Sequence, residues 1–190
     1  MDIRVIGLGN VLMADDGFGP YVVHKLHATY EFPEEVSVID VGTPGLDLTP
    51  YLMHADKLIV VDTVRSDGAA GSIRLYRRDQ ILRHAPQPRL GPHDPGLKET
   101  LLALDFNGTG PDEVLLVGVI PGATTARPHL SDPVREAVPD AVAEVVKELA
   151  RLGATPSPRL HPSTEGPWWE EPAETLAGDS SHPGIYPAVR

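Results

Sequence analysis

Three side chains that can bind a metal or transfer protons follow predicted strands of this chain. Asp16 lies in the region after the first strand-like run, which ends at Val5-Ile6-Gly7. Asp62 ends the apolar run from Lys57, and His93 lies in the loop Pro92-His93-Asp94-Pro95-Gly96. Two carboxylates and an imidazole suit nickel, zinc or iron better than soft ions. Three protein ligands also leave positions open for water or substrate, as in catalytic metal sites.

Such a set of ligands supports two hydrolytic routes. A metal held there can polarise a scissile carbonyl or activate a water molecule. Alternatively, one carboxylate acts directly as the general base. The spacing of the residues favours neither route. The chain contains no H-E-x-x-H or G-x-S-x-G motif. Asp62-Thr63 is followed by Val64, where pepsin-like enzymes have glycine, and no second copy occurs.

Each of these residues also has a structural interpretation. Aspartate is common at helix caps and turns, which fits Asp16 in Ala14-Asp15-Asp16-Gly17, and Asp15 is its chemical rival. A histidine such as His93 is often an ordinary loop residue. The run Gly7-Leu8-Gly9 resembles the start of a phosphate-binding loop, but Leu12 stands where G-x-G-x-x-G requires glycine.

The elements that must position these residues alternate between strand and helix patterns, which predicts an α/β fold with a mainly parallel sheet. Strands are expected at residues 3–7, 36–41, 57–62, 71–76 (possibly an edge strand) and 113–120. Helices are expected over 18–26, 46–53, 97–104 and from Ser131, which can cap the last helix, to Leu152. Pro139 is expected to kink this last helix or to mark its true start.

Open α/β sheets bind ligands outside the carboxyl ends of their strands, where the strand order reverses. If the order begins 2-1-3, the first and third strands are neighbours. Asp16 and Asp62 then overlook one crevice, and His93, on a later loop, can reach the same edge. This convergence depends on the fold, since the sequence spacing alone does not produce it.

Composition limits the possible partners and compartments. The chain has 190 residues, a formal net charge of -11 and no cysteine. A surface this acidic is a poor partner for nucleic acid or for anionic membranes. Its apolar runs are far shorter than the ~20 residues of a membrane span, and no signal peptide is evident. We therefore expect a cytoplasmic protein, and the lack of cysteine fits a reducing compartment.

The character of the chain changes near Gly153. The segment from there onward carries seven of the 20 prolines and shows no apolar periodicity. We therefore expect one domain over residues 1–152, followed by a Pro-rich tail over 153–190 that is disordered or loosely docked. Trp168-Trp169 is a candidate anchor for this tail.

Several segments of the chain, taken in order, resemble sequences of the hydrogenase maturation endopeptidase family. They occur in order over about residues 3–150, and the resemblance ends near residue 152. The matching segments are Gly7-Leu8-Gly9-Asn10-Val11-Leu12, Asp15-Asp16-Gly17-Phe18-Gly19, Asp40-Val41-Gly42-Thr43-Pro44-Gly45, Asp56–Asp62, His93-Asp94-Pro95-Gly96-Leu97, Val117-Gly118 to Pro121, and Leu130-Ser131 with Ala137-Val138-Pro139.

The resemblance implies a three-layer α/β/α sandwich, phosphorylase/hydrolase-like, around a twisted and mainly parallel sheet. It implies an endopeptidase, of aspartyl type, that removes a C-terminal peptide from the large-subunit precursor of a nickel-iron hydrogenase after nickel is installed. The family's metal-contacting and catalytic residues correspond to Asp16, Asp62 and His93. Nickel in the precursor then serves as the recognition element, so we expect the isolated protein to hold metal weakly or not at all.

Three other functions fit the same frame. One is a nucleotide- or flavin-binding module that uses the first strand–helix turn. Another is a non-catalytic nickel chaperone or checkpoint protein, which binds the precursor without changing its mass. The third is a paralogous peptidase that processes a different protein.

Overall fold

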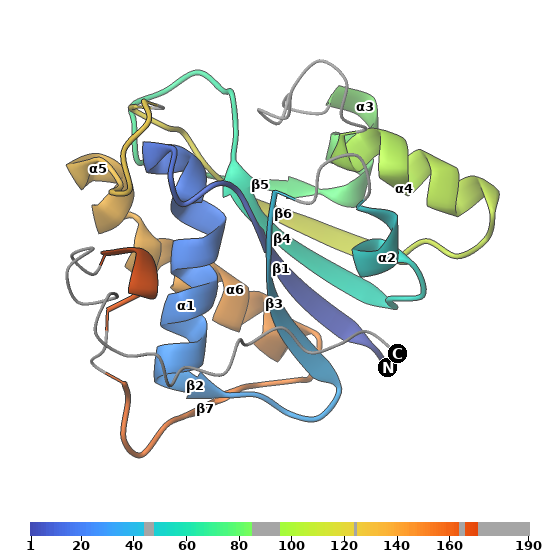
Figure 1. The fold of residues 1–190 in the computed structure, drawn as a ribbon. Coiled ribbons are helices and arrows are strands. Elements are labelled where there is room, and N and C mark those ends of the chain that lie inside the picture. The colour runs from blue at the N-terminus through green and yellow to red at the C-terminus, as the bar shows by residue number, and fades with distance from the viewer. Residues whose placement is uncertain (44–47, 85–95, 124, 164–165, 171–190) are drawn as a thin grey trace, which may run out of the picture.

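A twisted five-stranded sheet forms the centre of the molecule. The structure, a computed structural model, describes residues 1–43, 48–84, 96–123, 125–163 and 166–170. The strand order is β3-β1-β4-β6-β5, in which only β5 is antiparallel to its neighbour (Figure 1). The strands of this sheet are β1 (Ile3–Leu8), β3 (Val36–Gly42), β4 (Lys57–Thr63), β5 (Ile73–Arg77) and β6 (Glu113–Val119). The predicted α/β class, the start of the strand order and the edge position of β5 are confirmed.

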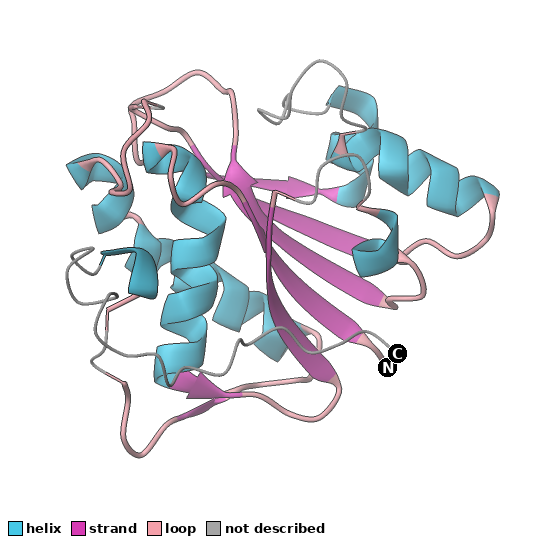
Figure 2. Cartoon of the chain, in the orientation of Figure 1, coloured by secondary structure: helices cyan, strands magenta, loops and turns pink. Residues whose placement is uncertain are grey.

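Helices cover both faces of the sheet (Figures 1 and 2). On one face lie α1 (Phe18–Thr29), α5 (Asp132–Glu136) and α6 (Val138–Arg151). On the other face lie α2 (Thr49–Leu52), α3 (Arg78–His84) and α4 (Leu97–Phe106). The architecture is therefore the expected three-layer α/β/α sandwich. Among the described residues, no helix combines the length and apolar character needed to cross a bilayer.

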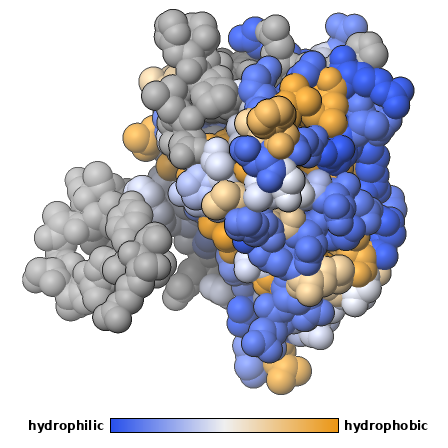
Figure 3. All heavy atoms as spheres, turned by 90° about the vertical axis from the view of Figure 1, so that its right-hand side faces the viewer, coloured by the Kyte–Doolittle hydropathy of each residue, from blue (hydrophilic) through white to orange (hydrophobic). Residues whose placement is uncertain are grey.

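The continuous apolar run of β4 follows from this double coverage. Side chains alternate across a strand, so its odd and even positions enter different cores. Ile59 and Val61 pack in the core beneath α1 and α6. Leu58 and Val60 pack in the second core with residues of α2 and α4. Figure 3 shows the side with α2, α3 and α4, where hydrophilic residues dominate the described surface and apolar residues form separate patches.

The last predicted helix is divided in two. Helix α5 ends at Glu136 and α6 begins at Val138, so Pro139 lies in the first turn of a new helix, where its missing N–H costs nothing. Ser131 occupies the N-cap position of α5, but its side chain makes no capping hydrogen bond. The predicted N-cap position is confirmed, but the side-chain capping bond is absent, and the Ser131 hydroxyl donates to Asp15 at 2.9 Å.

The described part of the Pro-rich tail packs against the domain. Strand β7 (Ser157–Pro158) pairs with β2 (Tyr30–Glu31) in a separate two-stranded sheet. Further on, the short 3-10 helix η2 (Trp168–Glu170) buries Trp169 in the core beside α1. The ring of Trp169 lies edge-on to that of Tyr21, with centroids 5.3 Å apart. The end of the tail lies outside the described residues, and the domain boundary at residue 152 stays a prediction.

Candidate active site

Asp62 is a buried carboxyl group at the carboxyl end of β4. Only 7% of the residue is exposed, and its Oδ1 accepts a hydrogen bond from the Thr63 N–H at 2.6 Å. Burial raises the pKa of Asp62 to about 8, because the charged form loses its hydration. The Thr63 N–H opposes this shift, and the nearby charge of Asp16 reinforces it. Without a cation, Asp62 therefore retains its proton near neutral pH.

Asp16 lies in η1 (Ala14–Gly17), the 3-10 turn between β1 and α1. Its Oδ2 accepts a hydrogen bond from the backbone N–H of Asn10 at 3.1 Å. Strands β1 and β4 are adjacent, and the chain leaves β1 toward β3 on the opposite side, so the strand order reverses here. The η1 turn packs against β4, so Asp16 and Asp62 lie at the same edge of the sheet.

Glycines allow the η1 turn and the start of α1 to lie directly against β1. Gly9 has a φ of +133°, and a Cβ atom there would lie 1.7 Å from the Asp16 carbonyl oxygen. A Cβ on Gly19 would lie 2.3 Å from the Leu8 carbonyl oxygen. Close packing, rather than a phosphate loop, therefore accounts for the Gly7-Leu8-Gly9 run, because the chain's own backbone fills the space.

The neighbouring Asp15 has a structural role. It is fully buried, and its carboxylate accepts hydrogen bonds from the backbone N–H groups of Gly122, Ala123 and Ser131 and from the Ser131 hydroxyl, at 2.6–2.9 Å. These bonds fasten the η1 turn to the loop after β6 and so help to fix Asp16. In the sequence, Asp15 and Asp16 are chemical rivals, since no local signal reveals partners more than 100 residues away.

His93, the third predicted residue, lies outside the described residues, as does most of its loop (85–95). The structure therefore brings together Asp16 and Asp62, and the assignment of His93 stays a prediction. Within the described ranges, no group of three histidine, aspartate or glutamate side chains is placed to hold a metal ion.

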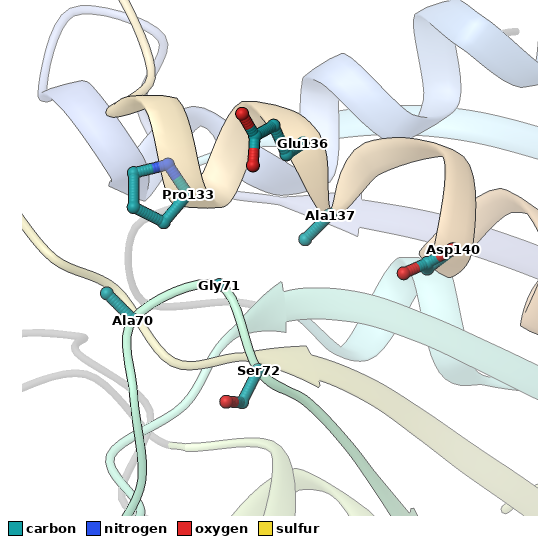
Figure 4. A pocket seen from close by; sticks show the side chains of 7 residues that line it. All are labelled: Ala70, Gly71, Ser72, Pro133, Glu136, Ala137 and Asp140. Carbon is teal, nitrogen blue, oxygen red and sulfur yellow. The ribbon is translucent and has the colours of Figure 1, made fainter.

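Two open pockets lie near the carboxyl edge of the sheet. The first, of about 410 Å³, is lined by residues that follow β4 and β6: Val64, Arg65, Ser66, Asp67, Ile120 and Pro121. The second, of about 440 Å³, lies between the segment before β5 and helices α5 and α6 (Figure 4). Its acidic residues, Glu136 and Asp140, come from the two helices. Neither pocket is lined by Asp16 or Asp62.

The fold and the acidic pair define an α/β protein whose site lies where the strand order of its sheet reverses, the switch point. Comparison with known proteins identifies the family. The profile of the hydrogenase maturation protease family matches residues 20–148. The chain is 32% identical to the hydrogenase 2 maturation protease of Escherichia coli K12 over 159 residues, covering 84% of this chain and 97% of that protein. Accordingly, the chain belongs to the hydrogenase maturation protease family and is a peptide-bond hydrolase of the endopeptidase type.

Structural and longer sequence matches agree with this membership. The structure of the hydrogenase maturating endopeptidase HybD from E. coli matches with a TM-score of 0.77 at 32% identity, covering 84% of this chain and 98% of that one. The hydrogenase expression/formation protein HupD of Bradyrhizobium diazoefficiens is 34% identical over 181 residues, 95% of this chain and 91% of that protein. This second alignment corrects the expectation that the resemblance ends near residue 152, since it extends into the Pro-rich tail.

Proposed function

We propose that this endopeptidase removes a C-terminal peptide from the nickel-loaded precursor of a nickel-iron hydrogenase large subunit. Asp16, Asp62 and His93 contact the nickel that the precursor carries. The observation that carries this proposal is the pair of carboxyl groups at the switch point, one of which is buried with a pKa of about 8. The names of the related proteins refer to hydrogenase maturation and support the choice of substrate.

The chemistry of Asp62 fits a cation that arrives with the substrate. A neutral carboxyl group is a poor metal ligand, so a free ion must first displace a proton from Asp62. This requirement lowers the affinity of the isolated protein for metal near neutral pH. An ion fixed in the precursor is held beside Asp62 by the whole protein–protein interface, and the nearby positive charge favours the carboxylate form.

Asp62 and Asp16 then perform different tasks. Asp16 is oriented by the Asn10 N–H, and its turn is fastened by the bonds to Asp15. On the base route, Asp62 takes a proton from the attacking water in its carboxylate form. The pKa of about 8 applies to the metal-free protein, and the positive charge of nickel lowers it. When bound, nickel supplies Lewis-acid polarisation at this site. The substitution pattern and the pH profile of cleavage distinguish the base route from the metal route.

A nucleotide- or flavin-binding function fits the site less well. Such a module needs free backbone N–H groups in the first strand–helix turn. Here the Asn10 N–H is bonded to the carboxylate of Asp16, and the Asp16 backbone fills the space beside Gly9. We also propose that the reaction takes place in the cytoplasm, since a chain without cysteine fits a reducing compartment.

The test mixes the purified protein with nickel-loaded or nickel-free large-subunit precursor and weighs the products by mass spectrometry. We expect loss of a short C-terminal peptide from the loaded precursor only. Asp62→Ala and His93→Ala should abolish the cleavage. Asp112→Asn is the matched control, because Asp112 is exposed and lies just before β6, at the opposite edge of the sheet. Binding without any change in precursor mass would instead identify a chaperone, and cleavage of the nickel-free form would refute the role of nickel.

A further inference from the structure

Two arginines at the carboxyl edge of the sheet differ from the others. Within the part of the chain that the structure describes, the side chains of Arg65 and Arg127 form no hydrogen bond or ion pair with another described residue. Each of the other described arginines has at least one partner. Arg78, for example, pairs with Asp105, and Arg74 donates to the Asp67 carbonyl oxygen. In a chain with a formal net charge of -11, two cations without a partner among the described residues are candidates to bind an external anion.

Arg65 lines an open pocket next to the candidate site. It is exposed and follows Asp62 by three residues. The Val64 N–H donates to the Val119 carbonyl oxygen at 2.9 Å, so the alignment of β4 with β6 continues to the border of the pocket. The apolar wall of the pocket is formed by Val64, Ile120 and Pro121. The pocket of about 410 Å³ is large enough for one or two peptide side chains.

Arg127 lies on the loop after β6 and is also exposed. Its backbone forms an isolated parallel bridge with Met13, and its carbonyl oxygen accepts a hydrogen bond from the Ala14 N–H at 2.7 Å. This contact places Arg127 beside the turn that carries Asp16. The two cations therefore stand on loops that border the acidic pair, one after each of the central strands β4 and β6.

We propose that Arg65 binds a carboxylate of the precursor's C-terminal segment, which occupies the pocket lined by Arg65, and that Arg127 adds a second positive charge along the path of that segment. This inference rests on the proposed function. The planar guanidinium presents paired N–H groups that match a carboxylate, while the apolar wall accepts the neighbouring side chain. Asp67 also lines the pocket and repels anions, so the favourable position for the carboxylate is at Arg65.

The test measures steady-state cleavage of the nickel-loaded precursor by the full-length protein and by Arg65→Gln, Arg127→Gln and the double variant. Lys25→Gln is the matched control, because Lys25 is exposed on α1 and its loss removes the same charge. For Arg65→Gln we expect KM to rise about tenfold, which is about 1.4 kcal/mol, with kcat within about twofold. We expect a smaller rise for Arg127→Gln and no change for Lys25→Gln. Unaltered melting temperatures would show that all the variants fold.

Altered substrates identify the source of the carboxylate. Precursors in which single acidic residues of the C-terminal segment become amides test a side-chain carboxylate, and a precursor with an amidated C-terminus tests the terminal one. One modified precursor lacks the carboxylate that Arg65 binds. For this precursor, the KM of the wild-type enzyme should be raised, and the KM of Arg65→Gln should be no higher than that of the wild type. An unchanged KM for Arg65→Gln, with normal cleavage by the wild type, would overturn this inference alone. Failure of the wild type to cleave any loaded precursor would overturn the proposed function as well.

Discussion

Replacement of Asp62 by asparagine should make the metal-free protein more stable at neutral and higher pH. Asparagine has nearly the same shape, and its Oδ1 can still accept the Thr63 N–H bond that Asp62 accepts at 2.6 Å. It cannot ionise, so it removes the cost of a buried charge. Near the ordinary pKa of an aspartate and below it, the two proteins should differ little, because Asp62 is then protonated in both the folded and the unfolded chain.

The size of the effect follows from the shift in the pKa of Asp62, from 3.8 to about 8. Because the folded value is the higher one, the folded state binds the proton more tightly than the unfolded state. The stability that the protonated Asp62 contributes is fully present below about pH 4 and is lost as the pH rises through about 8. One pKa unit corresponds to about 1.4 kcal/mol, so roughly 4 kcal/mol of stability should be lost between about pH 5 and pH 8.

The assay is urea unfolding of the wild type and of Asp62→Asn at a series of pH values in the presence of a chelator. The difference between the two unfolding free energies isolates the titration of Asp62 from that of all other groups. We expect this difference to grow in favour of the variant by several kcal/mol between about pH 5 and pH 8. If the two free energies changed in parallel over this range, Asp62 would be ionised in the folded protein, and the account of a protonated carboxyl group awaiting a cation would be refuted.

Three further substitutions, two of them with a control substitution, test the packing around the site and the docking of the tail. Asp15→Asn should lower the unfolding free energy in urea by about 3 kcal/mol. The amide nitrogen of the asparagine would face backbone N–H donors that bond to a carboxylate in the wild type. Unchanged stability would contradict the structural role of Asp15. Gly9→Ala should abolish cleavage, since its Cβ would lie 1.7 Å from a carbonyl oxygen, whereas Gly42→Ala, also at positive φ but with no atom within 4 Å, should retain most activity. Trp169→Ala should lower the unfolding free energy by about 3 kcal/mol, because this residue is 9% exposed. Trp168→Ala, at a residue 61% exposed, should change it far less, and equal effects would argue against docking of η2.

The parts of the fold that the sequence predicts well are those with strong local patterns. The apolar run before Asp62 predicts a strand covered on both faces, and β4 fulfils this because its alternate side chains enter two different cores. Pro139 correctly predicts a break in the last helix. The convergence of Asp16 with Asp62 is also predictable, because strand order determines which carboxyl ends are neighbours.

The parts that sequence reasoning misses depend on distant contacts. Ser131 has the residue type of a helix cap, but Asp15, far away in the chain, accepts its hydroxyl hydrogen bond. The Trp168-Trp169 pair is correctly predicted as a candidate anchor of the tail, but the sequence does not reveal that Trp169 alone is buried, against Tyr21 and the core beside α1. The sequence likewise does not show that Arg65 lacks a partner among the described residues, since this depends on which arginines pair with distant groups, as Arg78 does with Asp105.

The central claim is that the acidic pair at the switch point binds the nickel carried by the precursor. Nickel X-ray absorption of the loaded precursor, alone and in a complex with the protease that is frozen before cleavage, tests this directly. We predict that the wild-type protease adds oxygen or nitrogen ligands to the nickel. The Asp62→Ala protease, added in the same amount, should still form the complex but should add fewer of these ligands. A nickel spectrum that is identical with and without the bound wild-type protease would contradict the claim.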